Sequence, residues 1–347
     1  MTSVEAATRL FEDAAPRADW PEMLNQELWP AARRDLVALD LFAGCGGLAL
    51  GFEAAGFATR GFESHPDACA TYRLNLGGSC AEIELTATTD LPDADVVIGG
   101  PPCQPFSVGG RQMGLADARD GFPIFIAAIE RVQPRAFVFE NVRGLFYRNR
   151  WYLDEIVSAL ESFGYRVELR MLNAKQFGVP QNRERVFVVG HRGEFRFPEP
   201  LPQRPVTAGE ALGQLAEQIP AGSKFLTASM DAYVARYEKA SKCVRPRDLH
   251  LDRPARTLTC RNLAGATGDM QRIRLADGRR RRLTAREAAR LQSFPDWFEF
   301  VGGETSTYNQ IGNAVPPLLA LHVARAVRTH LVGSQRESVV EGTTAGV

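Results

Sequence analysis

The sequence lacks any apolar run that approaches the roughly 20 residues of a membrane-spanning helix. Its N-terminus, Met1 to Pro30, carries acidic residues and has no apolar signal-peptide core. None of the six cysteines forms a C-x-x-C pair, and their scatter suggests neither a zinc site nor a disulfide framework. Internal repeats are also absent. We therefore expect a cytoplasmic protein without a membrane span or a bound metal.

Net charge is lacking too, since 41 Lys and Arg balance 41 Asp and Glu, which on its face argues against a nucleic-acid partner. The charge is unevenly distributed, however. Residues 236–290 hold 16 Lys and Arg against 6 Asp and Glu, so the rest of the chain is acidic. This asymmetry is typical of a basic, salt-sensitive face for a polyanion on a non-basic body. By itself it favours the simpler alternative of a solvated surface.

The first half of the sequence alternates apolar strands with amphipathic helices. This alternation predicts an α/β fold with a doubly wound, mainly parallel Rossmann-like sheet. Ligands of such sheets bind beyond the carboxyl ends of the strands. The expected strands are Leu36–Phe42, Ala58–Glu63, Asp95–Ile98, Ala136–Glu140 and Arg185–Val189, and the expected helices lie near Leu48–Ala55, Pro123–Val132 and Trp151–Phe163.

The pattern becomes irregular after Gly190, and helical periodicity returns at Ala285–Leu291 and Val315–His330. We therefore expect a second, smaller domain inserted before a segment that rejoins the first. The resulting division is an N-terminal extension (1–34), a main domain (35–190), an irregular domain (191–283), a rejoining segment (284–332) and a small polar tail expected to be disordered (333–347).

A glycine-rich turn, DLFAGCGGL at Asp40–Leu48, joins the first expected strand to its helix. Gly44-x-Gly46-x-x-Ala49 satisfies a relaxed dinucleotide fingerprint, and Glu63 follows at the end of the next strand, where a carboxylate can accept ribose hydroxyl hydrogens. This indicates a nucleotide-like ligand, although it does not separate NAD from S-adenosylmethionine. A tight turn without a ligand is the alternative.

Two further strand ends carry reactive side chains. GGPPCQPFS at Gly99–Ser107 holds Cys103 among three prolines, a rigidity suited to a thiolate that attacks in one direction, although most lone cysteines are inert core residues. Glu140 ends the strand in FVFENVRG, and partial burial would raise its pKa and let it donate a proton. The alternative is an ordinary surface carboxylate.

A third segment, QNRER, places Gln181, Arg183 and Arg185 at the two-residue period of a strand, so that they share one face. Arginines aimed into one cleft would hold anionic oxygens or base carbonyls. A charged, solvent-exposed strand face is again the alternative.

Together these segments resemble the DNA (cytosine-5)-methyltransferase family of bacterial type. The matching blocks occur in the family's order between about Asp35 and Val327: DLFAGCGGL, FESH, GGPPCQPFS, FENVRG, QNRER, RLTAREAARLQSFPD and YNQIGNAVPP. The resemblance implies a methyltransferase fold, with the irregular domain as target recognition domain. It also implies methyl transfer from S-adenosyl-L-methionine, which becomes S-adenosyl-L-homocysteine, to carbon 5 of a cytosine flipped out of duplex DNA.

The resemblance also implies residue roles. Cys103 would be the nucleophile, Glu140 its acid partner, and Arg183 and Arg185 supports of the base and the catalytic loop, while the loop at about Phe106–Asp120 would close over the base. Cofactor contacts would come from Asp40, Phe42, Ala43, Gly44, Gly46, Gly47, Glu63, Glu82 and Asn313. DNA contacts would come from Gln104, Ser107 and Gln181, with Arg272, Arg274, Arg279 and Arg280 as candidates from the basic region.

Two positions depart from the family pattern. Ser64 stands where the family often has an aromatic residue over the adenine, and Glu82 stands where the family usually has an aspartate. We expect a monomer that modifies double-stranded DNA within a restriction–modification system, its cognate endonuclease acting without direct contact. The alternatives are a transfer-RNA methyltransferase, disfavoured because the recognition region has no Cys-Phe-Thr triplet, a catalytically silent DNA-binding relative, and a nicotinamide dehydrogenase.

Overall fold

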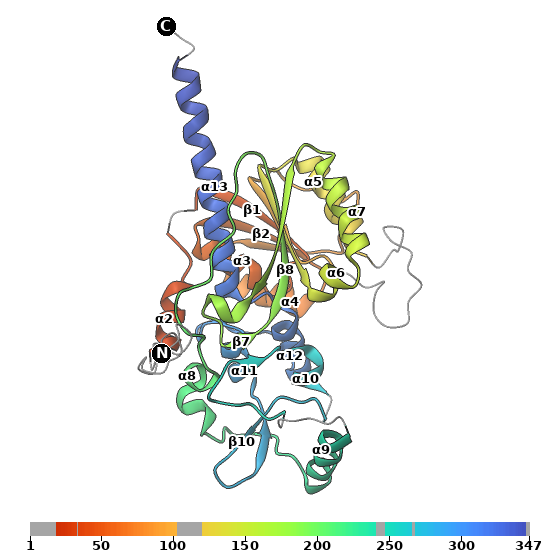
Figure 1. Cartoon of the computed structure of the whole chain (residues 1–347), viewed down its shortest axis with the longest axis vertical. Helices are drawn as coiled ribbons and strands as arrows, with labels where there is room; N and C mark the ends of the chain where they lie inside the picture. Colours follow the sequence, from red (N-terminus) through yellow and green to blue (C-terminus); the bar gives the residue numbers. More distant parts are fainter. Residues whose placement is uncertain (1–18, 33, 103–119, 241–246, 266–267, 345–347) are drawn as a thin grey trace, which may run out of the picture.

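The computed structural model describes residues 19–32, 34–102, 120–240, 247–265 and 268–344. Its centre is a seven-stranded sheet in the order β3-β2-β1-β4-β5-β8-β6, in which β8 runs opposite to the other six strands (Figure 1). The predicted doubly wound, mainly parallel sheet is therefore confirmed. The strands are β1 (Leu36–Leu41), β2 (Phe57–Glu63), β3 (Ser79–Glu82), β4 (Val96–Gly99), β5 (Ala136–Val142), β6 (Arg166–Asn173) and β8 (Glu184–His191).

Helices bury both faces of this sheet, as its apolar strands require. One apolar cluster joins the sheet to the first helices and to the C-terminal helix, and a second joins it to the helices that flank β5. The first layer contains α2 (Trp20–Glu27), α3 (Gly47–Ala54), α4 (Pro66–Asn75) and α13 (Pro317–Thr344), and the second α5 (Phe122–Val132), α6 (Arg143–Tyr147) and α7 (Arg150–Glu161).

A smaller lobe lies beyond the carboxyl ends of the parallel strands, at the bottom of Figure 1. Its only sheets among the described residues are two-stranded, which fits the irregular sequence there. The lobe and its junction contain β7 (Gln181–Asn182), α8 (Ala208–Leu212), α9 (Ala228–Ala240), β9 (Ala255–Arg256), α10 (Cys260–Ala264), β10 (Arg272–Arg274), β11 (Arg280–Arg282), α11 (Ala285–Leu291) and α12 (Glu304–Asn313).

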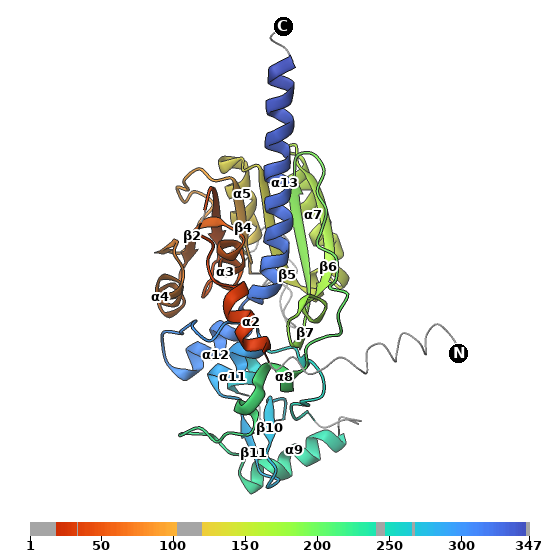
Figure 2. The same cartoon turned by 90° about the vertical axis from the view of Figure 1, so that its left-hand side faces the viewer.

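Helices lie at both ends of the described chain. Trp20 and Leu24 of α2 are buried in the main core, and the Trp20 indole donates a hydrogen bond to the Gly178 carbonyl (3.1 Å), so this part of the N-terminal extension belongs to the main domain. Helix α13 runs to Thr344 and so continues past Gly333, where the sequence predicts the start of a polar tail. The segment has no proline, and a helix anchored by packing extends at one hydrogen bond per residue (Figure 2).

No helix within the described ranges combines the length and the apolar content that a bilayer crossing requires.

Candidate active site

The glycine-rich turn and Glu63 form one unit at the carboxyl end of the sheet. Phe42, Gly44 and Gly46 all have positive φ, so the chain turns sharply after β1. One carboxylate oxygen of Glu63 accepts a hydrogen bond from the Gly44 amide (2.7 Å), and the other accepts one from the His65 amide (2.7 Å). The glycine-rich turn and the acid at the end of the next strand are thus in direct contact.

The turn has the properties of a ligand cradle. A Cβ at Gly46 would lie 2.6 Å from Leu76 and one at Gly47 2.5 Å from the Val315 carbonyl, whereas one at Gly44 would meet nothing within 4 Å. The buried Asp40 has a carboxylate oxygen without a hydrogen-bond partner in the described structure. Burial, aided by the charge of Glu63, raises the pKa of Asp40 well above its usual range. A nucleoside ligand with several hydrogen-bonding groups fits this site.

Glu140 and Arg185 form a largely buried ion pair two strands away. Glu140 is near the end of β5, and the Arg185 Nε lies 2.9 Å from its Oε1, with both side chains only about a tenth exposed. Burial raises the pKa of Glu140, while Arg185 and then Arg183 oppose that rise. The net shift of the Glu140 pKa is upward, and Arg185 fixes the orientation of the carboxyl group.

The proline-rich loop begins beside this pair. Asn141 donates a hydrogen bond through Nδ2 to the Pro101 carbonyl (2.9 Å), and a Cβ at Gly100 would lie 3.9 Å from the Glu140 carboxylate. The GGPP and ENV motifs therefore meet at adjacent strand ends. Cys103, Gln104 and Ser107, together with most of the loop predicted to close over the base, lie outside the described residues.

Arg183 joins three segments of the chain. Its guanidinium is buried and donates hydrogen bonds to the carbonyls of Leu258 (2.7 Å), Gly312 (3.1 Å) and Ala314 (3.0 Å). Since Glu140 and Arg185 also influence its pKa, it lies next to the ion pair. The structure thus places it behind the site as a connector of both lobes.

We expect Arg183→Lys to lower the free energy of unfolding by about 3 kcal/mol, because a lysine cannot reach all three carbonyls and buried unsatisfied acceptors cost about 1–3 kcal/mol each. Chemical denaturation measures this loss. The exposed Arg131→Lys is the matched control and should change stability by less than about 0.5 kcal/mol. Equal stability of the two variants would contradict the connecting role.

Gln181 has a similar internal role, which corrects its prediction as a DNA contact. It is fully buried, its Nε2 donates to the Leu291 carbonyl (3.1 Å) and to Gln292, and its Oε1 accepts from the Leu258 amide (2.9 Å). All its hydrogen-bonding atoms are engaged within the protein, so it is not accessible to DNA in this structure. Gln181 and Arg183 do share one face, as the two-residue strand period predicts. That face packs against the junction of the two lobes and not against DNA.

Asn313 also lies at this junction. It is exposed at the end of α12, its Oδ1 accepts a hydrogen bond from the Cys260 thiol (2.9 Å), and the neighbouring Ala314 carbonyl binds Arg183. Gly47 of the glycine-rich turn lies close to the Val315 carbonyl, two residues after Asn313. The segment from Asn313 to Val315 therefore lies between the predicted cofactor pocket and the predicted catalytic pocket.

The basic region is mostly paired internally. Arg272 is fully buried against Glu238 (2.9 Å) and Asp248, and Arg280 pairs with Asp231 (2.6 Å), so neither presents a free cation. For Arg272 the predicted phosphate contact is contradicted by this burial. The predicted sites Arg274 and Arg279 are 56% exposed and remain accessible, although each has an acidic neighbour.

One candidate residue was missed by the sequence analysis. Glu82 and Ser64 are both exposed near Glu63, and Glu82 is paired in register with Glu63 across β2 and β3. The next residue, Ile83, is 41% exposed, and its amide donates to the Glu63 carbonyl (2.9 Å). A bulky apolar side chain exposed beside a nucleotide-like cradle is the signal that could have identified it.

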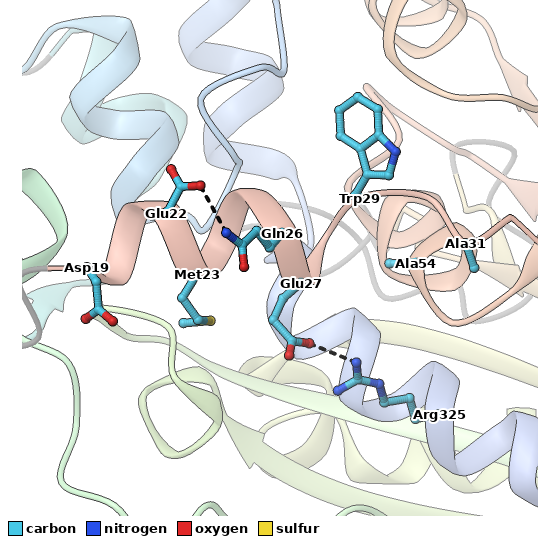
Figure 3. Close-up of a pocket in the computed structure, with 9 residues that line it drawn as sticks. All are labelled: Asp19, Glu22, Met23, Gln26, Glu27, Trp29, Ala31, Ala54 and Arg325. Carbon is cyan, nitrogen blue, oxygen red and sulfur yellow. Dashed lines mark hydrogen bonds and ion pairs between the residues drawn. The ribbon is translucent and has the colours of Figure 1, made fainter.

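A separate pocket of about 590 Å³ lies between α2 and α13 (Figure 3). Four of its polar side chains pair with one another, since Gln26 bonds Glu22 (3.1 Å) and Arg325 pairs with Glu27 (2.8 Å). It includes none of the predicted site residues, so the chemistry is assigned to the strand ends instead.

The comparisons with known proteins agree with this geometry. Residues 36–329 match the C-5 cytosine-specific DNA methylase family. The chain belongs to that family. It is 58% identical over 319 residues to the Type II methyltransferase M.AplI of Arthrospira platensis, covering 91% of this chain and 92% of that protein. It is 37% identical to the Type II methyltransferase M1.HphI of Haemophilus parahaemolyticus, covering 84% and 86%.

Solved structures of methyltransferases have the same fold. The S. pombe Dnmt2 methyltransferase superimposes with a TM-score of 0.66 at 20% identity, over 84% of this chain and 98% of that one. A Spodoptera frugiperda DNMT2 mutant gives 0.66 at 16% identity, over 86% and 100%. The predicted bacterial DNA cytosine-5 methyltransferase family is therefore confirmed by the sequence relatives, and the predicted fold by these structures.

Proposed function

We propose that this DNA cytosine-5 methyltransferase acts on a cytosine flipped out of a specific duplex DNA site, through a covalent bond between Cys103 and carbon 6 of the ring. The observation that supports this most strongly is the buried Glu140–Arg185 pair beside the start of the proline-rich loop. A carboxyl group with a raised pKa at that position can donate a proton to a bound base.

The cofactor site of the proposal is the cradle formed by the glycine-rich turn. S-adenosylmethionine, when bound, supplies an electrophilic methyl group. Glu63 would accept hydrogen bonds from the ribose hydroxyls, and the turn from Phe42 to Gly47 would lie along the ligand. Ile83 and Glu82 would border the adenine. They would replace the aromatic side chain that the family often has at the position of Ser64.

The chain's own residues would activate the cytosine. Attack by the Cys103 thiolate on carbon 6 breaks the aromaticity of the ring and makes carbon 5 nucleophilic. Glu140 would donate a proton to ring N3, where negative charge otherwise develops, and Arg185 would hold the carboxyl group and reach O2 of the base. Carbon 5 would then bond to the methyl group that S-adenosylmethionine supplies, and N3 would return its proton to Glu140. Loss of the carbon 5 proton to a base would push out the Cys103 thiolate and restore the aromatic ring.

The ribose contact gives a direct prediction. Glu63→Gln should weaken S-adenosylmethionine binding by roughly 10- to 100-fold, because charge-assisted hydrogen bonds contribute about 1.5–3 kcal/mol. Isothermal titration calorimetry measures the affinity. The matched control Glu161→Gln, an exposed carboxylate at the end of α7, should bind as the wild type does. Unchanged affinity in Glu63→Gln would show that Glu63 does not bind the ribose.

The substrate is tested by comparing labelled methyl incorporation into duplex DNA and into transfer RNA. We expect incorporation into DNA, and a clear preference for RNA would overturn the proposal. Bisulfite sequencing of DNA from cells that express the protein then gives the methylated site. A single short recurring sequence, protected from one endonuclease, would fit the modification enzyme of a restriction–modification system, the role that the names of the Type II relatives suggest.

A further inference from the structure

An exposed aromatic and basic surface begins three residues after Glu140. We define it as the α6–α7 surface, formed by Arg143, Tyr147, Arg148, Arg150 and Trp151. We propose that this surface binds the phosphate backbone of the DNA strand next to the flipped cytosine, an inference that rests on the proposed function.

The exposure of these side chains is not required by packing. Tyr147 is 59% exposed and Trp151 42% exposed, while the adjacent Tyr152 and Leu153 are fully buried in the second core cluster. Two large aromatic residues directed to solvent on a short stretch, interleaved with arginines, are a composition that suits nucleic acid.

The guanidinium groups are oriented but only weakly neutralised. Arg143 lies over the Tyr147 ring (5.0 Å), and Arg150 lies over the Phe146 ring (5.1 Å). Their acidic partners are Glu184 and Asp154, both at 2.8 Å, in exposed pairs. Because such pairs contribute about 1 kcal/mol or less, a phosphate can displace either carboxylate.

Arg148 is the clearest free cation of the surface. Its side chain is exposed and has no hydrogen-bond or ion-pair partner among the described residues. The sequence from Val142 to Trp151 contains three arginines and no acidic residue. With Arg143 and Arg150 in exposed pairs with Glu184 and Asp154, Arg148 supplies the net positive charge of the surface. Arg272 and Arg280 differ, because their acidic partners lie inside the recognition lobe.

The α6–α7 surface lies where the DNA backbone next to a flipped cytosine would pass. A flipped base enters the pocket while its backbone stays at the rim. Three extended residues span about 10 Å, and a DNA strand carries one charge per about 3.4 Å. A strand whose cytosine reaches Glu140 thus brings several phosphates within reach of α6, which also packs against β8, the strand of Arg185.

The test compares two double variants with equal loss of charge. Arg143→Ala/Arg148→Ala changes the surface, and Arg131→Ala/Arg166→Ala is the matched control. The control residues lie at the opposite end of the sheet, because Arg166 and Ala136 both pair in register with His191. The probe is a short fluorescein-labelled duplex of random sequence, whose binding is followed by fluorescence polarisation over a series of salt concentrations.

We expect the surface variant to bind DNA roughly tenfold more weakly and to lose about two units of the slope of log affinity against log salt, since each phosphate contact contributes about 0.9. The control should match the wild type. Calorimetry should show unchanged S-adenosylmethionine binding in both. Arg148→Glu, a single exposed change, should weaken DNA binding further and keeps the test valid if the double variant unfolds.

Two failures are distinguishable. If the wild type methylates DNA but the surface variants retain the affinity and salt slope of the control, the α6–α7 surface serves another partner, such as a protein, and this inference is wrong while the function stands. If the wild type neither binds DNA in a salt-dependent manner nor transfers a methyl group to it, the proposed function itself fails.

Discussion

Replacing Cys103 by serine should lower the rate of methyl transfer by roughly 10⁴-fold or more, the scale seen when a covalent nucleophile is removed. A serine hydroxyl is far less acidic than a thiol, so little alkoxide is available to attack carbon 6 of the base. Single-turnover transfer of labelled methyl to DNA measures the rate without a contribution from product release.

Binding should survive in this variant. The cradle at Glu63 and Gly44 and the exposed arginines are untouched, so affinities for S-adenosylmethionine and DNA should stay within a few-fold of the wild type. Cys69→Ser is the control for loss of a thiol elsewhere, because Cys69 is buried against Cys80, and it should retain turnover. A Cys103→Ser variant with near-normal turnover would rule out the covalent mechanism.

Glu140→Gln should reduce the rate by roughly 10²- to 10⁴-fold, the usual contribution of a positioned acid. The amide has nearly the size of the carboxyl group and can still donate a hydrogen bond to N3, but it cannot deliver a proton. It also removes the charge that neutralises Arg185, whose side chain is only 11% exposed. The variant should therefore lose both proton donation and the fixed orientation of the pair.

Two controls separate these effects. Chemical denaturation measures the stability lost by leaving Arg185 unpaired, and rates are taken where the variant is fully folded. Glu130→Gln, an exposed carboxylate on α5, provides a matched variant that should transfer methyl at the wild-type rate. A Glu140→Gln enzyme that keeps more than about a tenth of the wild-type rate would assign proton donation to another group.

The main sheet could be predicted from sequence because its central strands are continuous apolar runs. β1, β4 and β5 are buried along almost their whole length, and their runs were recognised within a residue or two. The edge strands β3 and β6 were missed. β3 is short and β6 alternates in exposure, and in both strands exposed positions outnumber buried ones. Their pairing is set by the neighbouring strands.

The sequence predicts which residues lie at the strand ends, but it does not always predict what each side chain contacts. Strand order brings Glu63 and Glu140 to one edge of the sheet, as expected from parallel strands. Arg272 was misjudged because the acids that neutralise it, Glu238 and Asp248, are 34 and 24 residues away in the chain. Only the folded lobe brings such charges together, so a basic stretch in sequence does not establish a basic surface.

The covalent bond to the base is the central claim, and a trapped adduct tests it most directly. In 5-fluorocytosine, carbon 5 carries no proton to lose after methyl transfer, so the thiolate cannot be expelled. Incubating the protein with S-adenosylmethionine and duplex DNA that carries this base at the methylated position should give a complex stable to denaturation, with the DNA attached to the peptide that contains Cys103. Complete release of unmodified protein on denaturation, or attachment at another residue, would contradict the account.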